Sequence, residues 1–121
     1  MKSIDRFEDI MAWQKARSLT KDVYASTRVG AFARDFGLRD QIQRASVSTM
    51  ANIAEGFGKS NRSTAELQRF LSMAVGSADE MRVWLRYCLD LGYVSESQWQ
   101  AWRDEYEEIA KMLQGLSKSV Q

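Results

Sequence analysis

The sequence predicts an all-α fold, an antiparallel up-down four-helix bundle that occupies residues 1–121 as a single domain and assembles as a homo-oligomer. Three observations lead to this fold class. The chain has no proline, which suits long helices because proline breaks a helix interior. Apolar residues recur three and four positions apart over long stretches, which is the period of a helix face. Short segments separate these stretches, so consecutive helices are expected to run antiparallel.

The first two helices are predicted at approximately 9–28 and 35–57. Glu8 and Asp9 place negative charge near the positive end of the first helix dipole. Gly30 is expected to stop that helix. Gly56 and Gly58 are expected to end the second helix, since glycine commonly caps a helix at its carboxyl end.

The last two helices are predicted at approximately 63–91 and 95–118. Ser63 and Glu66 have the spacing of a capping box, in which the serine side chain accepts a hydrogen bond from the backbone three residues on. Ser95 and Gln98 repeat this spacing at the start of the fourth helix. Gly92 marks the end of the third helix.

The third predicted helix carries two neighbouring rows at helical spacing, and the fourth carries one. The row on the fourth helix comprises Trp99, Trp102, Tyr106, Ile109, Leu113, Leu116 and Val120. The first row on the third helix comprises Leu67, Leu71, Ala74, Ala78, Met81, Leu85 and Cys88. The second comprises Phe70, Met73, Ser77, Glu80, Trp84, Tyr87 and Leu91. A bundle helix needs one apolar stripe, so the second row either widens the core of a monomer or forms a subunit interface. The interface interpretation is preferred, with Phe70, Met73, Trp84 and Tyr87 as its residues.

The composition argues against an enzyme and against a metal or cofactor site. The chain has no histidine, the commonest general base and a frequent metal ligand, and its one cysteine provides no zinc cluster. The segment from Gly56 to Ser60 ends like a phosphate-binding loop, but Ile53 stands where that motif needs glycine. Glu55 and Glu80 are predicted to be paired structurally if they are buried, and Cys88 to be a small buried apolar residue.

The charge distribution leaves room for nucleic-acid binding without requiring it. The net charge is only +1, but residues 1–62 hold 11 basic and 7 acidic side chains against 6 and 9 in residues 63–121. The candidate phosphate contacts are expected to cluster around the second connection and its flanking helices, and they are Arg39, Arg44, Lys59, Arg62 and Arg69. Further basic residues lie along the first helix, namely Lys15, Arg17, Lys21 and Arg28. A solvated charged face is the alternative interpretation of both groups.

The sequence is expected to belong to a cytoplasmic protein with no membrane contact. The first residues lack the apolar run of a signal peptide, and no stretch approaches the ~20 apolar residues of a membrane span. A single cysteine also suits a reducing compartment.

Several segments resemble the bacterial four-helix-bundle family named for the 23S rRNA intervening sequence. The most specific is Ala51-Asn52-Ile53-Ala54-Glu55-Gly56, and the resemblance extends from Arg6 over nearly the whole chain. It departs from the family at Met50, where a proline is usual, and at Val29-Gly30-Ala31, where the family has Phe-Pro. The family is also related to the accessory proteins of diversity-generating retroelements, which partner a reverse transcriptase and nucleic acid through a basic surface.

The resemblance implies a homopentameric ring without enzymatic activity. With the basic amino-terminal half, it predicts a non-catalytic oligomer that binds structured RNA or a nucleic-acid-processing protein. The alternative is a protein-binding scaffold oligomer with no nucleic-acid role.

Overall fold

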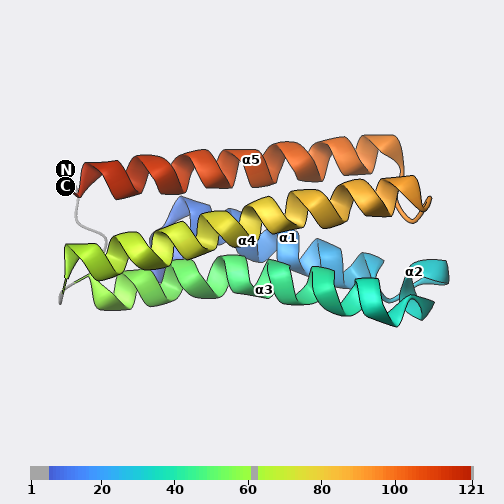
Figure 1. Cartoon of the computed structure of the whole chain (residues 1–121), viewed down its shortest axis with the longest axis horizontal. Helices are drawn as coiled ribbons and strands as arrows, with labels where there is room; N and C mark the ends of the chain where they lie inside the picture. Colours follow the sequence, from blue (N-terminus) through green and yellow to red (C-terminus); the bar gives the residue numbers. More distant parts are fainter. Residues whose placement is uncertain (1–5, 61–62, 121) are drawn as a thin grey trace.

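Four long helices lie side by side and alternate in direction (Figure 1). The computed structural model describes residues 6–60 and 63–120. Its elements are a 3-10 turn η1 (Phe7–Asp9), then α1 (Met11–Ser26), α2 (Gly30–Arg34), α3 (Phe36–Lys59), α4 (Thr64–Asp90) and α5 (Glu96–Ser119). The predicted all-α fold with four long helices is therefore confirmed, and the short α2 is an addition to it.

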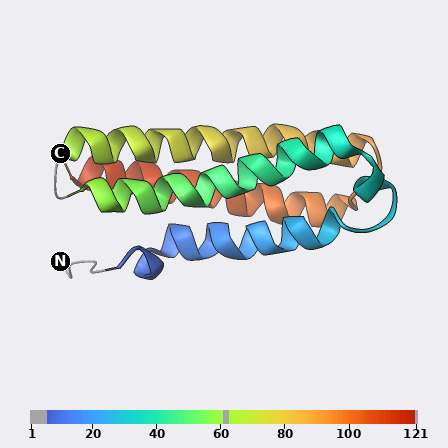
Figure 2. The same cartoon turned by 90° about the horizontal axis from the view of Figure 1, so that it is seen from below.

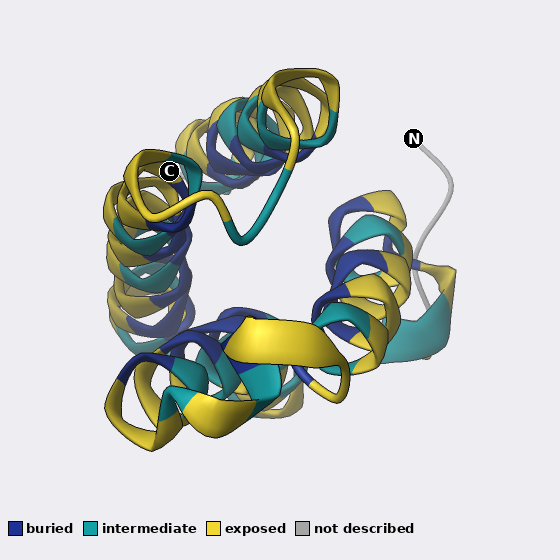
Figure 3. Cartoon of the chain, turned by 90° about the vertical axis from the view of Figure 1, so that its right-hand side faces the viewer, coloured by how far each residue is buried: buried dark blue, intermediate teal, exposed yellow. Residues whose placement is uncertain are grey.

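The four long helices surround one core in the order α1, α3, α4, α5. Helix α1 packs against α3 and α5, and α4 packs against the other sides of the same two helices. Helices α1 and α4 are thus diagonal to each other, and Figure 2 shows them at opposite edges of the molecule. Buried residues line the inward side of each helix when the bundle is viewed along its axis (Figure 3).

The predicted core row of α4 is confirmed, whereas the predicted row of α5 is buried at four of its seven positions and partly buried at Trp99, Leu116 and Val120. Every member of the first row on α4 is buried in the described structure. On α5, the residues buried at the same helical spacing are Trp102, Tyr106, Ile109 and Leu113. These rows pack together at the spacing expected of bundle helices.

Both predicted capping boxes are confirmed on their serine side. The Ser63 hydroxyl accepts a hydrogen bond from the Glu66 backbone N–H at 3.3 Å, and Ser95 accepts from Gln98 at 3.1 Å. Gly92 has a φ of +76°, a left-handed conformation that favours glycine. Its N–H donates to the Leu89 carbonyl at 3.0 Å, a hydrogen bond typical of a glycine that ends a helix.

The first predicted helix and the role of Gly30 need correction. Helix α1 spans Met11–Ser26 rather than 9–28, because η1 occupies the residues before it. Gly30 has a φ of +63° and opens α2 instead of only stopping α1. Helix α2 is held by Phe32, which is buried and stacks on Tyr93 with ring centroids 5.2 Å apart.

Tyr93 connects the α4–α5 connection to the start of α3. Its hydroxyl donates a hydrogen bond to Asp35 Oδ2 at 2.9 Å, while Asp35 Oδ1 accepts from the Leu38 N–H. The hydrogen bond to Asp35 raises the pKa of Tyr93 above its ordinary value. One carboxylate therefore caps α3 and fastens this end of the bundle.

The prediction that Gly56 and Gly58 end the second helix is wrong. Helix α3 continues to Lys59, with Ser60 as its carboxyl cap, and both glycines are helical. Gly56 instead lies against α4, where a Cβ atom would stand 3.1 Å from the Cβ of Phe70. Its missing side chain allows a close approach of two helices, and the P-loop-like string forms no loop.

The fold predicts a loss of stability in alkali through two buried acids. Desolvation, with a smaller effect of Asp35, raises the pKa of the Cys88 thiol from 9.0 to about 12, and desolvation also raises the pKa of Tyr106. A raised folded-state pKa favours folding below the unfolded-state value and loses that contribution as pH rises toward the folded-state value. We expect the free energy of unfolding in urea to fall between about pH 9 and about pH 12. The double variant Cys88→Ala/Tyr106→Phe should show a shallower fall, and an unchanged slope would contradict the assignment.

Candidate oligomer interface and nucleic-acid surface

An incompletely covered row of large side chains runs along the side of α4 next to α3. We define the second α4 row as Met73, Ser77, Glu80, Trp84, Tyr87 and Leu91. Met73 is 45% exposed, Tyr87 50% and Leu91 41%, although all three are apolar or aromatic. Val83, one turn before Tyr87, is 62% exposed and was not predicted to belong here, since it lies outside the apolar spacing. Exposed apolar surface of this kind is typical of a protein interaction site.

Phe70 does not share this exposure. It is only 8% exposed, and its Cβ is the atom nearest to Gly56 across the α3–α4 contact. The Arg69 guanidinium lies 4.7 Å from the ring centroid. Phe70 therefore belongs to the packing within one chain, and it leaves little surface for a second subunit. The absence of a side chain on Gly56 explains how this ring fits.

Glu80 is exposed, so it needs no partner across the bundle. Its Oε2 accepts a hydrogen bond from Trp84 Nε1 at 2.9 Å, one turn along α4. This hydrogen bond satisfies the indole N–H of Trp84, a half-buried member of the second α4 row. The one carboxylate of this row thus orients an aromatic side chain.

A small polar residue of α3 contacts this row at Ser77. The hydroxyls of Ser48 and Ser77 lie 2.8 Å apart, and Asn52 Nδ2 donates to the Ser48 carbonyl at 2.9 Å. Asn52 therefore has a structural partner, while Glu55 is exposed. Glu55 and Glu80 are both exposed, so neither is a buried charge that needs a structural partner.

The structure does not bring the predicted nucleic-acid residues into one cluster. Arg39 and Lys59 are 20 positions apart on α3, which corresponds to about 30 Å along the helix axis. Arg39 is also engaged locally, since its Nη1 donates to the Ala33 carbonyl at 3.1 Å and its guanidinium lies 4.7 Å from the Phe36 ring centroid. The predicted single cluster is therefore wrong for Arg39.

The remaining members of that set are spread over the α3–α4 side. Arg44 is exposed in the middle of α3, and Lys59 is half-buried at its carboxyl end. Arg69 is exposed in the second turn of α4. Arg62 lies outside the described residues. These positions could contact separate phosphates of a long ligand, but they do not form a pocket for one.

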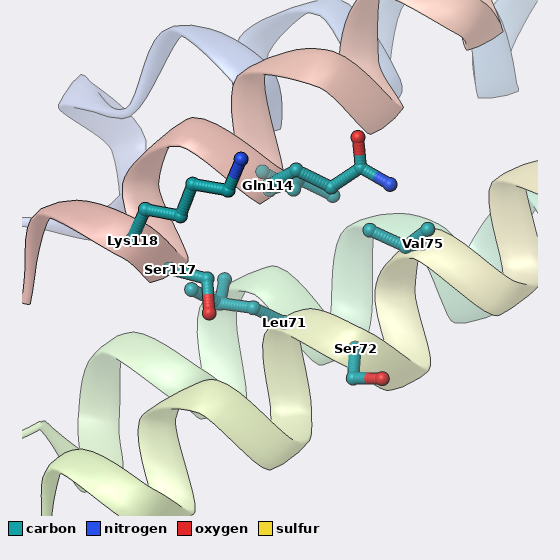
Figure 4. A pocket seen from close by; sticks show the side chains of 7 residues that line it. Leu71, Ser72, Val75, Gln114, Ser117 and Lys118 are labelled. Atoms are coloured by element: carbon teal, nitrogen blue, oxygen red, sulfur yellow. The ribbon is translucent and has the colours of Figure 1, made fainter. Parts of the chain in front are cut away.

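A shallow groove between α4 and α5 offers no pair of catalytic groups (Figure 4). It has a volume of about 250 Å³ and is lined by Leu71, Ser72, Val75, Leu113, Gln114, Ser117 and Lys118. Lys118 is its one ionisable lining residue, so the groove lacks the acid and base that proton transfer requires.

Over residues 6–60 and 63–120, no group of three potential metal ligands comes together. Within the same residues, none of the helices is both long and apolar enough to span a bilayer.

Comparisons with known proteins agree with this architecture. One solved structure, a protein of unknown function from the S23 ribosomal protein family of Bacteroides thetaiotaomicron, superimposes with a TM-score of 0.80. The two sequences are 23% identical over 92% of this chain and 98% of the other, so the likeness establishes the fold. Among curated proteins, none matches the chain. The family described as 23S rRNA-intervening sequence protein matches residues 8–115, nearly the whole bundle. The chain therefore belongs to the 23S rRNA-intervening sequence protein family.

Proposed function

We propose that the chain acts as a non-catalytic homopentamer that binds structured RNA. The second α4 row carries the assembly part of this proposal, because a single chain leaves Met73, Tyr87 and Leu91 substantially exposed. Burying these side chains against another copy removes apolar surface from water, which stabilises the assembly by roughly 25 cal/mol per Å². The count of five is what the family resemblance implies.

Structured RNA is the partner that the family and the charge distribution favour. The family takes its name from an insertion in ribosomal RNA, and the excess of basic residues lies in the first half of the chain. A symmetric ring repeats every basic patch once per subunit, so modest local charge adds up along a polyanion. This repetition is the reason that a net charge of +1 per chain is compatible with RNA binding.

A protein-binding scaffold is the second candidate, supported by the near-neutral charge and the aromatic second α4 row. Aromatic side chains are common anchors in protein interfaces. This candidate keeps the oligomer and replaces RNA by a protein partner, and it has no nucleic-acid role.

Light scattering during gel filtration tests the proposal, with absorbance recorded at 260 and 280 nm. The expected mass is about 70 kDa, five times the 13.9 kDa of one chain. Nucleic acid eluting with the protein, and lost at high salt, would support the RNA part. A pentamer that neither carries nucleic acid nor binds an added RNA duplex would favour the scaffold. A monomer would contradict the proposed interface.

A further inference from the structure

The outward side of α1 carries basic residues that have no acidic partner in the described structure. Arg17 and Lys21 are exposed and one helical turn apart, so they lie on the same side of α1. Arg28, also exposed, follows in the turn after the helix. Among the described residues, 6–60 and 63–120, no carboxylate lies within 4.0 Å of these three cations. Lys15 differs, because its Nζ lies 3.6 Å from Glu108 of α5.

Hydrogen-bonding side chains surround the two cations on α1. A shallow depression of about 170 Å³ is lined entirely by Gln14, Arg17, Ser18 and Lys21. The guanidinium, ammonium, amide and hydroxyl groups of these residues are all common donors to nucleic-acid phosphates. The lining contains no apolar residue that would favour a hydrophobic ligand. The depression is therefore suited to an anion that accepts several hydrogen bonds.

Arg17 is supported by an aromatic side chain beneath it. Its guanidinium lies 5.8 Å from the Trp13 ring centroid, and Trp13 is itself packed edge-on against Phe7 with centroids 4.9 Å apart. Stacking on a fixed ring restricts the guanidinium while leaving its donors accessible. Less conformational entropy is then lost when Arg17 contacts a phosphate.

The position of α1 keeps this surface away from the second α4 row. Helix α1 lies diagonally across the bundle from α4, and Figure 2 shows the two at opposite edges. A second copy that covers the second α4 row therefore does not reach α1 from that side, and a free α1 surface requires that the face which receives this row in a ring is not the outward side of α1. Each subunit of a ring would present one such surface.

We infer that the α1 surface formed by Gln14, Arg17, Ser18 and Lys21, extended by Arg28, binds the phosphate backbone of RNA. The inference rests on the proposed function and assigns its RNA contact to α1 rather than to the α3–α4 side. From Arg17 to Arg28 is 11 positions, or about 16 Å at the helical rise. A row of this length spans several successive phosphates and reads no base edges, so binding depends on backbone geometry and charge.

A matched pair of double variants tests the assignment by fluorescence anisotropy with a labelled 20-base-pair RNA duplex at low salt. We expect Arg17→Ala/Lys21→Ala to weaken binding about tenfold or more and to lower the salt slope by about 2. The control Lys111→Ala/Lys118→Ala removes the same charge from α5, where both lysines are exposed. It should bind within about twofold of the wild type. All four substitutions are at exposed helical positions, where alanine retains the fold.

Different outcomes overturn different parts of the proposal. If the wild type binds the duplex and the α1 variant loses no more affinity than the α5 control, the assignment to α1 is wrong and RNA binding stands. The same conclusion follows if Arg44→Ala/Lys59→Ala is the pair that loses affinity. If the wild type does not bind the duplex at low salt, the RNA part of the proposed function fails, and the inference fails with it. Tighter binding to polyglutamate of equal charge would instead identify an acidic protein as the partner.

Discussion

Replacing Met73 and Tyr87 together by glutamate is expected to convert the proposed pentamer into monomers that remain folded. Both side chains are about half exposed in a single chain, so carboxylates at these positions stay hydrated in the monomer. In the assembly, the same carboxylates would be buried without partners, which costs several kcal/mol per group. The mass measured by light scattering should fall about fivefold, the ratio of a pentamer to one subunit. Circular dichroism should show unchanged helix content.

The matched control places the same charges at the start of α1 and in the connection between α1 and α2. Met11, at the start of α1, is 60% exposed, and Val29, between α1 and α2, is 65% exposed. Because neither residue belongs to the second α4 row, Met11→Glu/Val29→Glu should remain a pentamer. If the Met73/Tyr87 variant keeps the full mass, the second α4 row is not the interface. If the control dissociates equally, the loss of mass is not specific to this row.

The second half of the fold was the most predictable from the sequence, for identifiable physical reasons. Ser63 and Ser95 mark helix starts because their side chains accept hydrogen bonds from backbone N–H groups only three residues away. Gly92 marks a helix end because its left-handed backbone conformation is energetically unfavourable for residues with a side chain. These are local interactions, so the local sequence is sufficient to predict them.

The features that could not be predicted depend on distant residues. Helix α2 is held by the contact of Phe32 with Tyr93, some 60 positions later in the chain. Gly56 lies within a helix that packs closely against Phe70 of α4. No sequence pattern around Gly56 reveals this contact. Tertiary packing here outweighs the weak preference of glycine for helix ends.

The candidate surfaces were predictable in outline and less so in detail. Helical spacing identified the second α4 row, but it could not tell that Phe70 turns toward α3 while Met73 remains exposed. The sequence suggests that the basic residues lie around one connection, whereas Arg39 and Lys59 lie at opposite ends of α3. Which cations lack an acidic partner depends on the neighbouring helix, as the contact between Lys15 and Glu108 shows.

The sharpest test of the helix packing is to give side chains to Gly56 and Gly58 separately. At Gly56, a Cβ atom would stand 3.1 Å from the Phe70 Cβ, an atom that no side-chain rotation can move away. Gly56→Leu must therefore separate α3 from α4, and we expect the free energy of unfolding to fall by about 3 kcal/mol.

At Gly58, only two residues away, a side chain is expected to raise the free energy of unfolding instead of lowering it. A Cβ atom there would have no neighbour within 4 Å, so alanine would only restrict the unfolded chain and favour the helix. Gly58→Ala should therefore raise the free energy of unfolding, measured in urea, by about 0.5–1 kcal/mol. If α3 ended before these residues, neither substitution would meet α4, and Gly56→Leu would cost no more than Gly58→Ala. Opposite signs at the two glycines would establish that α3 continues past both and that only Gly56 faces α4.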